Sequence, residues 1–289
     1  MKKKYTTKEI QKYILSIIKD VDAFCRENNI EYYLMGGSAL GAMRHRGFIP
    51  WDDDLDIFMT CENYEKFIQL FENKASKDKR YQKYFLQKEN TEEWALFLSR
   101  VCLNGTTMVS DEFKFNMKQH HNVFIDIMCL YSAPENNISR WFQYMAAQLL
   151  RVNALALSGF PNKSIVKKIA LKFSKIIVNP VTRPMLIKYV HKYEGKNTQF
   201  MGHYFGRARF KNTSFPRKYL GKPRYVPFED TELPVFENVE EYLTARFGSK
   251  WMEMPSQETR DQYPVHGNFV DLDNDYVKYI SPDGKNWIY

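Results

Sequence analysis

The stretch GGSALGAMRHRGFIPWDDDLDI, residues 36–57, decides how the first half of the chain folds. The apolar run EYYLMGG that leads into it predicts a short strand ending at the glycines, and residues 38 to about 46 predict a helix. DLDIFM predicts the next strand, in which Asp54 and Asp56 share one face while Leu55 and Ile57 point into the core. A strand, a helix and a strand in this order indicate mixed α and β layers.

The rest of the chain continues this pattern and then becomes helical. Isoleucines at helical spacing predict a helix from Thr7 to about Asn28, and a second helix is predicted over 61–74. Apolar runs at 83–87, 95–103 and 122–131 predict strands, and residues 137–158, 164–177 and 182–194 predict helices. We therefore expect an α+β protein whose mixed sheet is followed by a helical section.

Four carboxylates, at positions 52, 53, 54 and 56, lie within five positions of the chain. Like charges this close raise one another's pKa, so the cluster is costly unless a cation neutralises it or solvent screens it. Asp54 and Asp56, side by side at a strand end, form an arrangement that hard divalent cations such as Mg²⁺ take, together with water and phosphate oxygens. The alternative is a solvated acidic turn, which the flanking core residues disfavour.

A glycine turn and a further acid extend the candidate site. Backbone N–H groups at a helix start, here after Gly36-Gly37-Ser38, make a natural phosphate site, although such turns also serve as simple connections. In the apolar run NVFIDIMCL, Asp126 is the only acid, and a charge there needs a cation or strong hydrogen bonds. It is either a metal ligand, a base that takes a hydroxyl proton, or the structural partner of Arg100. An anion held by the N–H groups of the glycine turn and bridged by a metal to Asp54 and Asp56 describes the phosphates of a nucleotide. Such an arrangement is typical of phosphoryl transfer.

The charge of the chain is unevenly distributed around a net value of +8. Residues 139–224 contain 18 Lys and Arg and one acid, whereas residues 225–289 contain 5 Lys and Arg and 13 acids. Such a basic block indicates an anionic partner, unless the acidic tail folds back and compensates it. The helix predicted at 164–177 has one apolar face and, mostly on the other, Lys167, Lys168, Lys172 and Lys175. This is typical either of a helix lying on a membrane or of an ordinary amphipathic helix with solvated lysines.

The cysteines and apolar segments bear on location. Cys25, Cys61, Cys102 and Cys129 lie far apart without metal-ligand spacing, which is typical of buried thiols in a reducing compartment. The basic N-terminus has apolar residues at helical spacing among polar ones, so we interpret it as an amphipathic helix rather than a signal peptide. No run approaches the ~20 apolar residues of a spanning helix. We expect a cytoplasmic protein.

The stretch at 36–57 resembles the signature of the LicD family, relatives of fukutin and fukutin-related protein in the nucleotidyltransferase-fold superfamily. The shared features are the Gly-Ser turn, the Arg44-His45 pair, the run GFIPW at 47–51 and the Asp triplet. FIDIM at 124–128 is similar to the family's third-acid block, and FEDTELPV…VEEYLTARFGSKWMEMP resembles its C-terminal block. Phe236 stands where proline is usual in the family, and Phe247-Gly248 stands where Tyr-Gly is usual. These departures lie outside the expected metal site, so they do not affect the expected chemistry, but they leave the identity of the acceptor undetermined.

The resemblance implies a nucleotidyltransferase-like mixed-sheet core, which we expect at 1–138. From the charge and helix patterns we expect a basic helical region at 139–224 and an acidic region at 225–289 that packs back on the core, all in one continuous unit. It implies transfer of a phospho-alcohol, such as phosphocholine, from a CDP-alcohol donor to a sugar hydroxyl of a cell-surface glycan, such as teichoic acid or capsule, or of its lipid-linked precursor. It also implies Mg²⁺ or Mn²⁺ as cofactor. From the basic block and the helix predicted at 164–177 we expect peripheral contact with the inner face of an anionic membrane.

Residue matching implies that Asp54, Asp56 and Asp126 are the catalytic and metal-binding residues and that Gly37 and Ser38 hold phosphate. In the mechanism that we expect, the further nucleotide- or phosphate-binding residues are Arg44, His45 and Arg100, the last a lone cation in an apolar run. For His45, a structural hydrogen bond is an equal alternative.

Two other functions use the same features. A nucleotidyltransferase would use these carboxylates to attack the α-phosphorus and transfer NMP, and its released product, pyrophosphate instead of CMP, distinguishes it. A non-catalytic protein would bind a membrane or nucleic acid through the basic block. The aromatic residues are spread along the chain and form no motif with basic residues, so no nucleic acid partner is expected.

Overall fold

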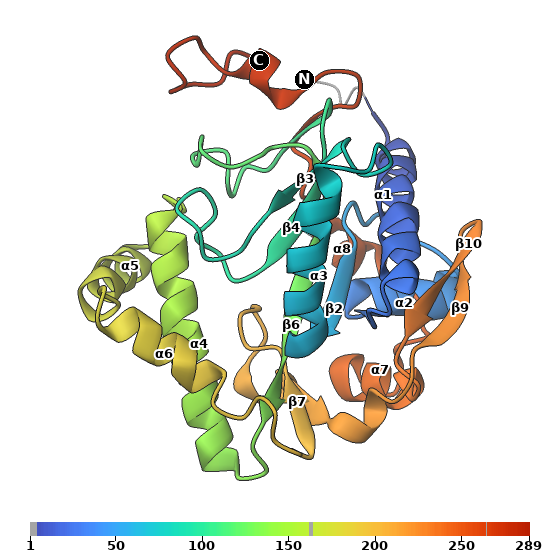
Figure 1. Cartoon of the computed structure of the whole chain (residues 1–289), viewed down its shortest axis with the longest axis vertical. Helices are drawn as coiled ribbons and strands as arrows, with labels where there is room; N and C mark the ends of the chain where they lie inside the picture. Colours follow the sequence, from blue (N-terminus) through green and yellow to red (C-terminus); the bar gives the residue numbers. More distant parts are fainter. Residues whose placement is uncertain (1–4, 162–163, 264) are drawn as a thin grey trace.

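The computed structural model describes residues 5–161, 164–263 and 265–289, and a mixed β-sheet lies at its centre (Figure 1). Its strand order is β1-β2-β6-β4-β3, and β7 and β8 extend it beyond one end of β6. The strands are β1 (Tyr33–Leu34), β2 (Asp56–Thr60), β3 (Tyr84–Gln87), β4 (Ser99–Leu103), β6 (Val123–Ala133), β7 (Phe200–Gly202) and β8 (Ser214–Pro216).

The central strand β6 determines which residues of the other strands meet. All eleven of its residues are buried, which explains its nearly continuous apolar sequence. It pairs in parallel with β2 and antiparallel with β4. In this register Asp126 is the Cα partner of both Asp56 and Arg100. The sheet therefore brings together residues from three distant parts of the chain.

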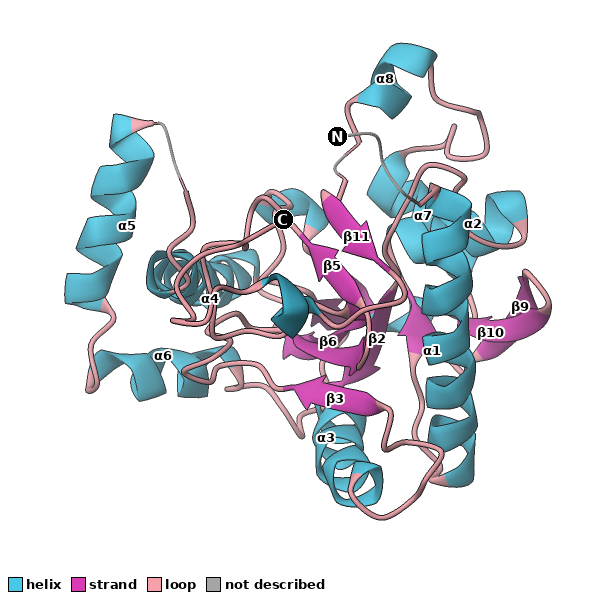
Figure 2. Cartoon of the chain, turned by 90° about the horizontal axis from the view of Figure 1, so that it is seen from above, coloured by secondary structure: helices cyan, strands magenta, loops and turns pink. Residues whose placement is uncertain are grey.

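Two helices pack together beside the sheet. α1 (Thr7–Glu27) begins with a capping box between Thr6 and Glu9, and α3 (Cys61–Ala75) follows β2 directly. Phe24 of α1 lies edge-on to Phe67 and Phe71 of α3, with ring centroids 5.5 and 5.0 Å apart. Figure 2 shows both helices alongside the strands.

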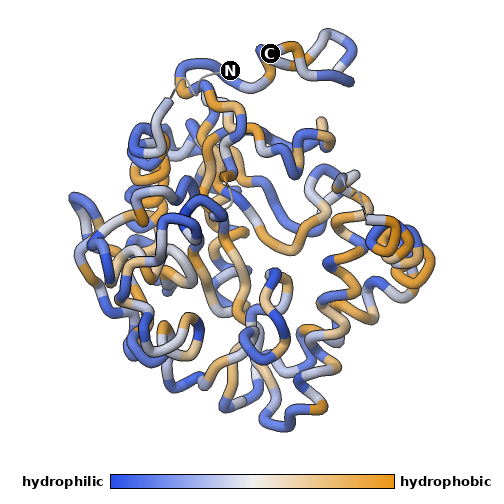
Figure 3. Tube along the Cα trace, turned by 180° about the vertical axis from the view of Figure 1, so that it is seen from behind, coloured by the Kyte–Doolittle hydropathy of each residue, from blue (hydrophilic) through white to orange (hydrophobic). Residues whose placement is uncertain are grey.

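Three further helices, α4 (Asn137–Leu157), α5 (Ile165–Ile177) and α6 (Thr182–Val190), form a group beside the sheet, at the left of Figure 1. α4 contacts both α5 and α6. Coloured by hydropathy in Figure 3, this group shows much apolar sequence at the edge of the molecule. Among the described residues, no helix has the length and apolar content needed to cross a bilayer.

The last quarter of the chain packs against β1, α2 and β5. The hairpin of β9 (Arg224–Phe228) and β10 (Thr231–Val235) lies beside β1 and α2 (Gly37–His45), and α7 (Val239–Phe247) also contacts α2. The short α8 (Gln257–Asp261) follows, and β11 (Phe269–Asp271) pairs with β5 (Thr107–Val109). Single 3₁₀ turns lie at Phe210–Asn212, Arg217–Tyr219 and Tyr276–Tyr279.

The expected α+β class and the expected helices are confirmed, and all five expected strands are present at least in part. Several boundaries differ, and β1 covers only Tyr33–Leu34 of its expected run. β2 begins at Asp56, so Asp54 lies in the extended segment before the strand, and the run at 95–103 is a strand only from Ser99. α6 ends at Val190 rather than at 194. An apolar run indicates that its residues are buried, but it does not distinguish a strand from a buried loop. Buried loop residues such as Trp94 therefore made the expected strand too long.

The expectation of four free thiols is wrong for two of the cysteines. Cys61 and Cys129 are joined in a disulfide, with Cα atoms 5.4 Å apart, whereas Cys25 and Cys102 are free and buried. The pairing follows from the sheet, because Cys61 comes directly after β2 and Cys129 lies in the adjacent strand β6. Their wide separation in sequence concealed this proximity.

The acidic tail compensates little of the basic block by direct pairing. In the described ranges, a single ion pair, between Arg224 and Glu240, joins residues 139–224 to residues 225–289. Most of the positive charge of the block therefore has no partner in the tail.

Candidate active site

The acidic run enters the sheet with alternating side chains. Leu55 and Ile57 are fully buried, whereas Asp54 and Asp56 are half-buried, so the expected alternation holds although only Asp56 is within the strand. The side chain of Gln11 fixes the approach to the run by donating hydrogen bonds to the carbonyls of Ile49 and Asp52, at 3.0 and 2.8 Å.

Asp126 reaches the same place from β6, with Arg100 beside it. The Nε–H of Arg100 donates to Oδ1 of Asp126 at 2.7 Å, and both residues are buried. The guanidinium also lies over the rings of Trp94 and Phe124, 4.4 and 3.7 Å from their centroids. The pairing with Arg100, one of the alternatives drawn from the sequence, is therefore present. It positions one carboxylate oxygen, and Oδ2 accepts no hydrogen bond from any described residue.

The carboxylates of the run strongly influence one another. Burial and the neighbouring Asp54 raise the pKa of Asp52 to about 8. Burial, followed by the charges of Asp54 and Asp126, raises the pKa of Asp56 well above its usual range, and burial also raises the pKa of Asp54. The site therefore binds protons or cations at neutral pH rather than holding all its carboxylates as free anions.

His266, from the acidic tail, supplies a positive charge that the sequence had not revealed. Its Nδ1 lies 3.0 Å from Oδ1 of Asp53 and its Nε2 lies 3.4 Å from Oδ2 of Asp54. Burial alone would lower its pKa, but the hydrogen bond to Asp53 and the charge of Asp54 outweigh burial and raise the pKa to about 10. His266 is thus an imidazolium at neutral pH and offsets part of the acidic charge.

Asp53 connects the tail to the run. Its carboxylate accepts the backbone N–H groups of His266 and Gly267 at 2.9 to 3.1 Å, in addition to the imidazole. Burial would raise its pKa, but these hydrogen bonds lower it. Asp53 is therefore a buried, ionised residue that holds the tail in place.

The glycine turn lies next to the acids, as expected. Gly36 has a φ of 64°, a conformation that favours glycine, and its N–H donates to the hydroxyl of Tyr242 at 3.0 Å. A Cβ on Gly37 would lie 3.1 Å from Oδ2 of Asp52. The Oγ of Ser38 accepts the N–H of Asp56 at 2.8 Å, which ties the helix start to β2.

Arg44 and His45 do not join this group. They lie at the other end of α2, which is about 13 Å long. Nη1 of Arg44 donates to the carbonyls of Trp251 and Glu253, each at 3.1 Å, and the ring of His45 lies edge-on to Trp51. Nη2 of Arg44 and Nε2 of His45 have no partner among the described residues. Burial, then the charge of Arg44, lowers the pKa of His45, so the imidazole is neutral at neutral pH.

The aspartates are the right type of ligand for a hard divalent cation, but their side chains are not arranged around a common point. Aspartate oxygens are the ligands that Mg²⁺ prefers, and the raised pKa values of Asp52 and Asp56 indicate uncompensated negative charge. However, no three His, Cys, Asp or Glu side chains within the described ranges converge as a coordination sphere. Asp54, Asp56 and Asp126 are therefore candidate ligands that would need to reorient.

Sequence reasoning missed His266, which the fold brings to the acidic run, and Tyr242, which it brings to the glycine turn. The signal for His266 was weak, a histidine-glycine pair in an otherwise acidic tail. For Tyr242 the signal was its place in the C-terminal block, whose α7 lies against the start of α2.

Comparison with known proteins relates part of the chain to one family. Residues 29–152 match the family described as LicD/FKTN/FKRP, nucleotidyltransferase domain. Over 69 residues the chain is 44% identical to the lipopolysaccharide cholinephosphotransferase LicD of Haemophilus influenzae, covering 24% of this chain and 26% of that protein.

Two uncharacterized rickettsial proteins are also similar. The match in Rickettsia typhi is 42% identical over 57 residues, covering 20% of this chain and 18% of that protein. The match in Rickettsia prowazekii is 44% identical over 50 residues, covering 17% of this chain and 19% of that protein. The chain thus matches about a quarter or less of the length of each relative.

Proposed function

We propose that this chain is a phosphotransferase that moves a phospho-alcohol from a CDP-activated donor to a sugar hydroxyl, because residues 29–152 match the LicD/FKTN/FKRP family. Phosphocholine is the first donor group to test, since the similar Haemophilus protein is named a cholinephosphotransferase. We propose as acceptor a cell-surface glycan, such as lipopolysaccharide, teichoic acid or capsule, or its lipid-linked precursor.

One observation supports this proposal above the others: the register of β2 and β6 sets Asp56 beside Asp126, with Asp54 in the segment leading in. Two acids from adjacent strands and a third from the segment before β2, next to a glycine turn at a helix start, suit a diphosphate and an attacking hydroxyl. A purely structural acid cluster would be expected to have a cation for each carboxylate. Here Arg100 forms an ion pair with Asp126, and His266 forms ion pairs with Asp53 and Asp54. Among the described residues, Asp52 and Asp56 have no cationic partner.

In the proposed reaction, the acceptor hydroxyl oxygen forms a bond to the phosphorus that bears the alcohol. The bond from that phosphorus to the bridging oxygen breaks, and the electron pair leaves with CMP. The hydroxyl proton passes to the carboxylate of Asp126, which Arg100 orients through Oδ1. The N–H groups at Gly37 and Ser38, at the start of α2, would face the phosphates.

We propose Asp54, Asp56 and Asp126 as the residues that would hold Mg²⁺ or Mn²⁺. When bound, such an ion would spread the charge of the diphosphate and of the departing CMP. His266 limits the remaining negative charge of the run, and Asp53 keeps His266 in position. Arg44 and His45, at the far end of α2, would contact the donor beyond the diphosphate or stabilise the loop around Trp51.

The experiment uses the purified chain with Mg²⁺, a panel of CDP-alcohols, CTP, and soluble glycan fragments. The proposal predicts CMP release together with a phospho-alcohol mass increment on the glycan. Pyrophosphate from CTP with transfer of CMP to the acceptor would instead identify a nucleotidyltransferase. The inactive control is Asp56→Asn, and the matched active control is Asp230→Asn, because Asp230 is an exposed acid distant from the run in sequence.

A further inference from the structure

The group of α4, α5 and α6 exposes an unusual amount of apolar surface. On α5, the six residues Ile165, Val166, Ile169, Phe173, Ile176 and Ile177 are between 37% and 75% exposed. Ile138, Trp141, Phe142 and Met145 of α4 are exposed as well. Contiguous apolar patches of this kind mark interaction sites, whereas isolated apolar side chains on a surface do not.

α5 does not use its apolar stripe to pack against its own protein. A surface helix normally buries that stripe against the core, but on α5 only Ser174 is buried. The lysine face of the helix is exposed too. The interpretation of α5 as an ordinary amphipathic helix, which the sequence left open, therefore does not account for its apolar face.

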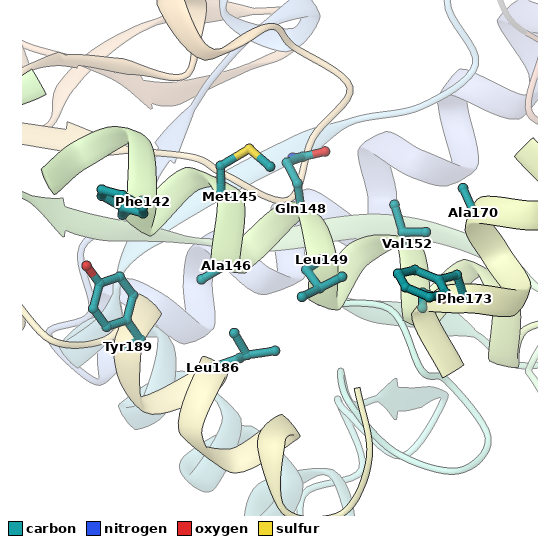
Figure 4. Close-up of a pocket in the computed structure, with 11 residues that line it drawn as sticks. Phe142, Met145, Ala146, Gln148, Leu149, Val152, Ala170, Phe173, Leu186 and Tyr189 are labelled. Carbon is teal, nitrogen blue, oxygen red and sulfur yellow. The ribbon is translucent and has the colours of Figure 1, made fainter. Parts of the chain in front are cut away.

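A groove continues this surface between the helices. It has a volume of about 550 Å³, and Phe142, Met145 and Leu149 of α4 line it together with Phe173 of α5 and Leu186 and Tyr189 of α6 (Figure 4). Phe173 belongs both to the groove and to the exposed stripe of α5. The apolar surface therefore extends from α5 across the groove to α4.

The charge of the same segment selects the kind of partner. Residues 137–190 contain nine Lys and Arg and no Asp or Glu. In the part of the chain that the structure describes, Lys167, Lys168, Lys172 and Lys175 form no ion pair, so their charge is available to an external anion. A partner must therefore combine an apolar interior with a dense anionic surface, and an anionic phospholipid bilayer has both.

We propose that α4, α5 and α6 form a docking surface for anionic membranes. α5 lies in the plane of the interface with its apolar stripe among the acyl chains, and its lysines reach the headgroups along their aliphatic stems. The attachment is peripheral, since no described helix could span the bilayer. The inference goes beyond the catalytic proposal and does not depend on it.

The first test measures binding of the purified chain to vesicles of phosphatidylcholine alone and of phosphatidylcholine mixed equally with phosphatidylglycerol. Wild type should bind the mixed vesicles, with binding weakened by salt, and should bind the neutral ones far less. Replacing Lys167, Lys168, Lys172 and Lys175 by Gln should reduce vesicle affinity about fivefold per lysine that lies at the surface. The matched control replaces the exposed Lys8, Lys12, Lys77 and Lys79 by Gln, which changes the net charge equally and should leave most binding intact.

The second test asks whether α5 enters the membrane. An Ile169→Cys variant carries an environment-sensitive thiol dye at a 63% exposed position, and a Val277→Cys variant carries it at a 62% exposed position outside the helical group. The four native cysteines are buried, so labelling is selective. Mixed vesicles should shift the emission of the dye to the blue at position 169 and not at 277.

Three outcomes would overturn the proposal. Wild type could fail to bind mixed vesicles, or both lysine variants could lose affinity equally, which would indicate net charge alone. The third is a blue shift at position 169 that depends on protein concentration and not on vesicles, which would identify a second copy of the chain as the occupant of this surface. None of these readouts uses enzymatic activity, so they remain separate from a failure of the proposed reaction.

Discussion

Asp56 is subject to two opposing demands. Burial and the charges of Asp54 and Asp126 disfavour its ionised form, as its raised pKa shows, whereas a metal ligand must be ionised. Because the pKa in the folded protein is raised, the free energy of unfolding falls as pH rises above the usual carboxyl range, unless a cation binds. If Asp56 is a metal ligand, function and stability conflict at this residue, as is common at active sites.

The substitution Asp56→Asn separates the two demands. Turnover should be abolished, because a ligand is lost, while the metal-free protein at pH 8 should unfold at the same or a higher temperature than wild type, because a buried charge is removed. Turnover and thermal unfolding are measured on the same preparations, with Asp230→Asn as control. Near-normal turnover of Asp56→Asn would contradict the metal assignment.

Asp126 and Arg100 require a two-step experiment because they form a buried pair. Asp126→Asn should lower the rate by roughly a hundredfold to ten-thousandfold if Asp126 is the base, with little change in donor binding. It should also lower the free energy of unfolding by about 3–5 kcal/mol, because Arg100 loses its partner.

Adding Arg100→Met should recover most of that stability, since the site of the guanidinium between Trp94 and Phe124 suits an apolar side chain. The rate should stay low. Recovery of the rate along with the stability would show that Asp126 is structural and not a base.

His121 gives a prediction for pH that lies outside the acidic run. Its ring is buried, with Nε2 at 3.0 Å from the carbonyl of Asn116 and Nδ1 at 3.2 Å from Nε2 of Gln119, so Nε2 donates and Nδ1 accepts. Burial lowers its pKa from 6.5 to about 4. A lowered pKa contributes stability that is present above pH 6.5 and is lost as the pH falls toward 4.

Urea unfolding of wild type and His121→Gln between pH 4 and 7 measures this contribution, because glutamine does not titrate. On acidification, the unfolding free energy of wild type should fall relative to that of His121→Gln by up to about 1.4 kcal/mol per pH unit. Parallel pH profiles for the two proteins would mean that His121 does not titrate in this way.

At the level of elements, α2 and the loop after it form one unit. A Cβ on Gly41 would lie 2.6 Å from the carbonyl oxygen of Gly47 and 3.3 Å from the amide nitrogen of Ile49. The loop runs on into the acidic residues, and Glu229 of the β9–β10 turn supports it by accepting the N–H of Phe48 at 3.1 Å. The close approach of helix and loop therefore positions the acidic run.

Gly41→Ala tests this contact. Alanine in a helix is about 1 kcal/mol more favourable than glycine, so with free space the change would stabilise the protein. Because the new methyl group meets backbone, we expect a loss of roughly 1–3 kcal/mol in unfolding free energy and a lower turnover. Calorimetry and the CMP assay measure the two effects, and increased stability would show that the contact is not tight.

The elements were predictable where their patterns are local. Isoleucine spacing predicted α1, and the apolar run with one acid predicted β6, because burial of one face or of a whole strand leaves a direct mark on the sequence. The neighbours in the sheet were not predictable in this way. That Asp56 lies beside Asp126, or Cys61 next to Cys129, depends on strand order and register, which connect residues about 70 positions apart.

The site was predictable to the same extent. The acids, the glycine turn and the Arg100 pairing followed from residues that look out of place in their own segment. His266 is an ordinary residue in its segment and gains its role only by contact with Asp53 and Asp54. Its charged state, in turn, depends on the fold rather than on the residue type.

At the level of the whole molecule, the docking surface on α4, α5 and α6 is separate from the acidic run at 52–56. A substitution can therefore change membrane binding without changing the acidic run. If the proposed reaction holds, replacing Lys167, Lys168, Lys172 and Lys175 by Gln should slow transfer to lipid-linked acceptors in vesicles, because the protein is no longer concentrated at the membrane surface. Transfer to soluble sugar fragments should be unchanged. If the variant transferred to the lipid-linked acceptor as fast as wild type, and to the soluble acceptor as fast as wild type, membrane docking would have no role in the reaction.

The contact of His266 with Asp53 and Asp54 gives the protein a vulnerable period during its synthesis. Asp126 leaves the ribosome 140 residues before His266, an interval of about 7 to 28 s at roughly 5–20 residues per second. In that interval β2 and β6 are already available to pair, but the imidazole that partners Asp53 and Asp54 has not been made. Until His266 is made, we expect these carboxylates to be neutralised by protons or by cations from solution.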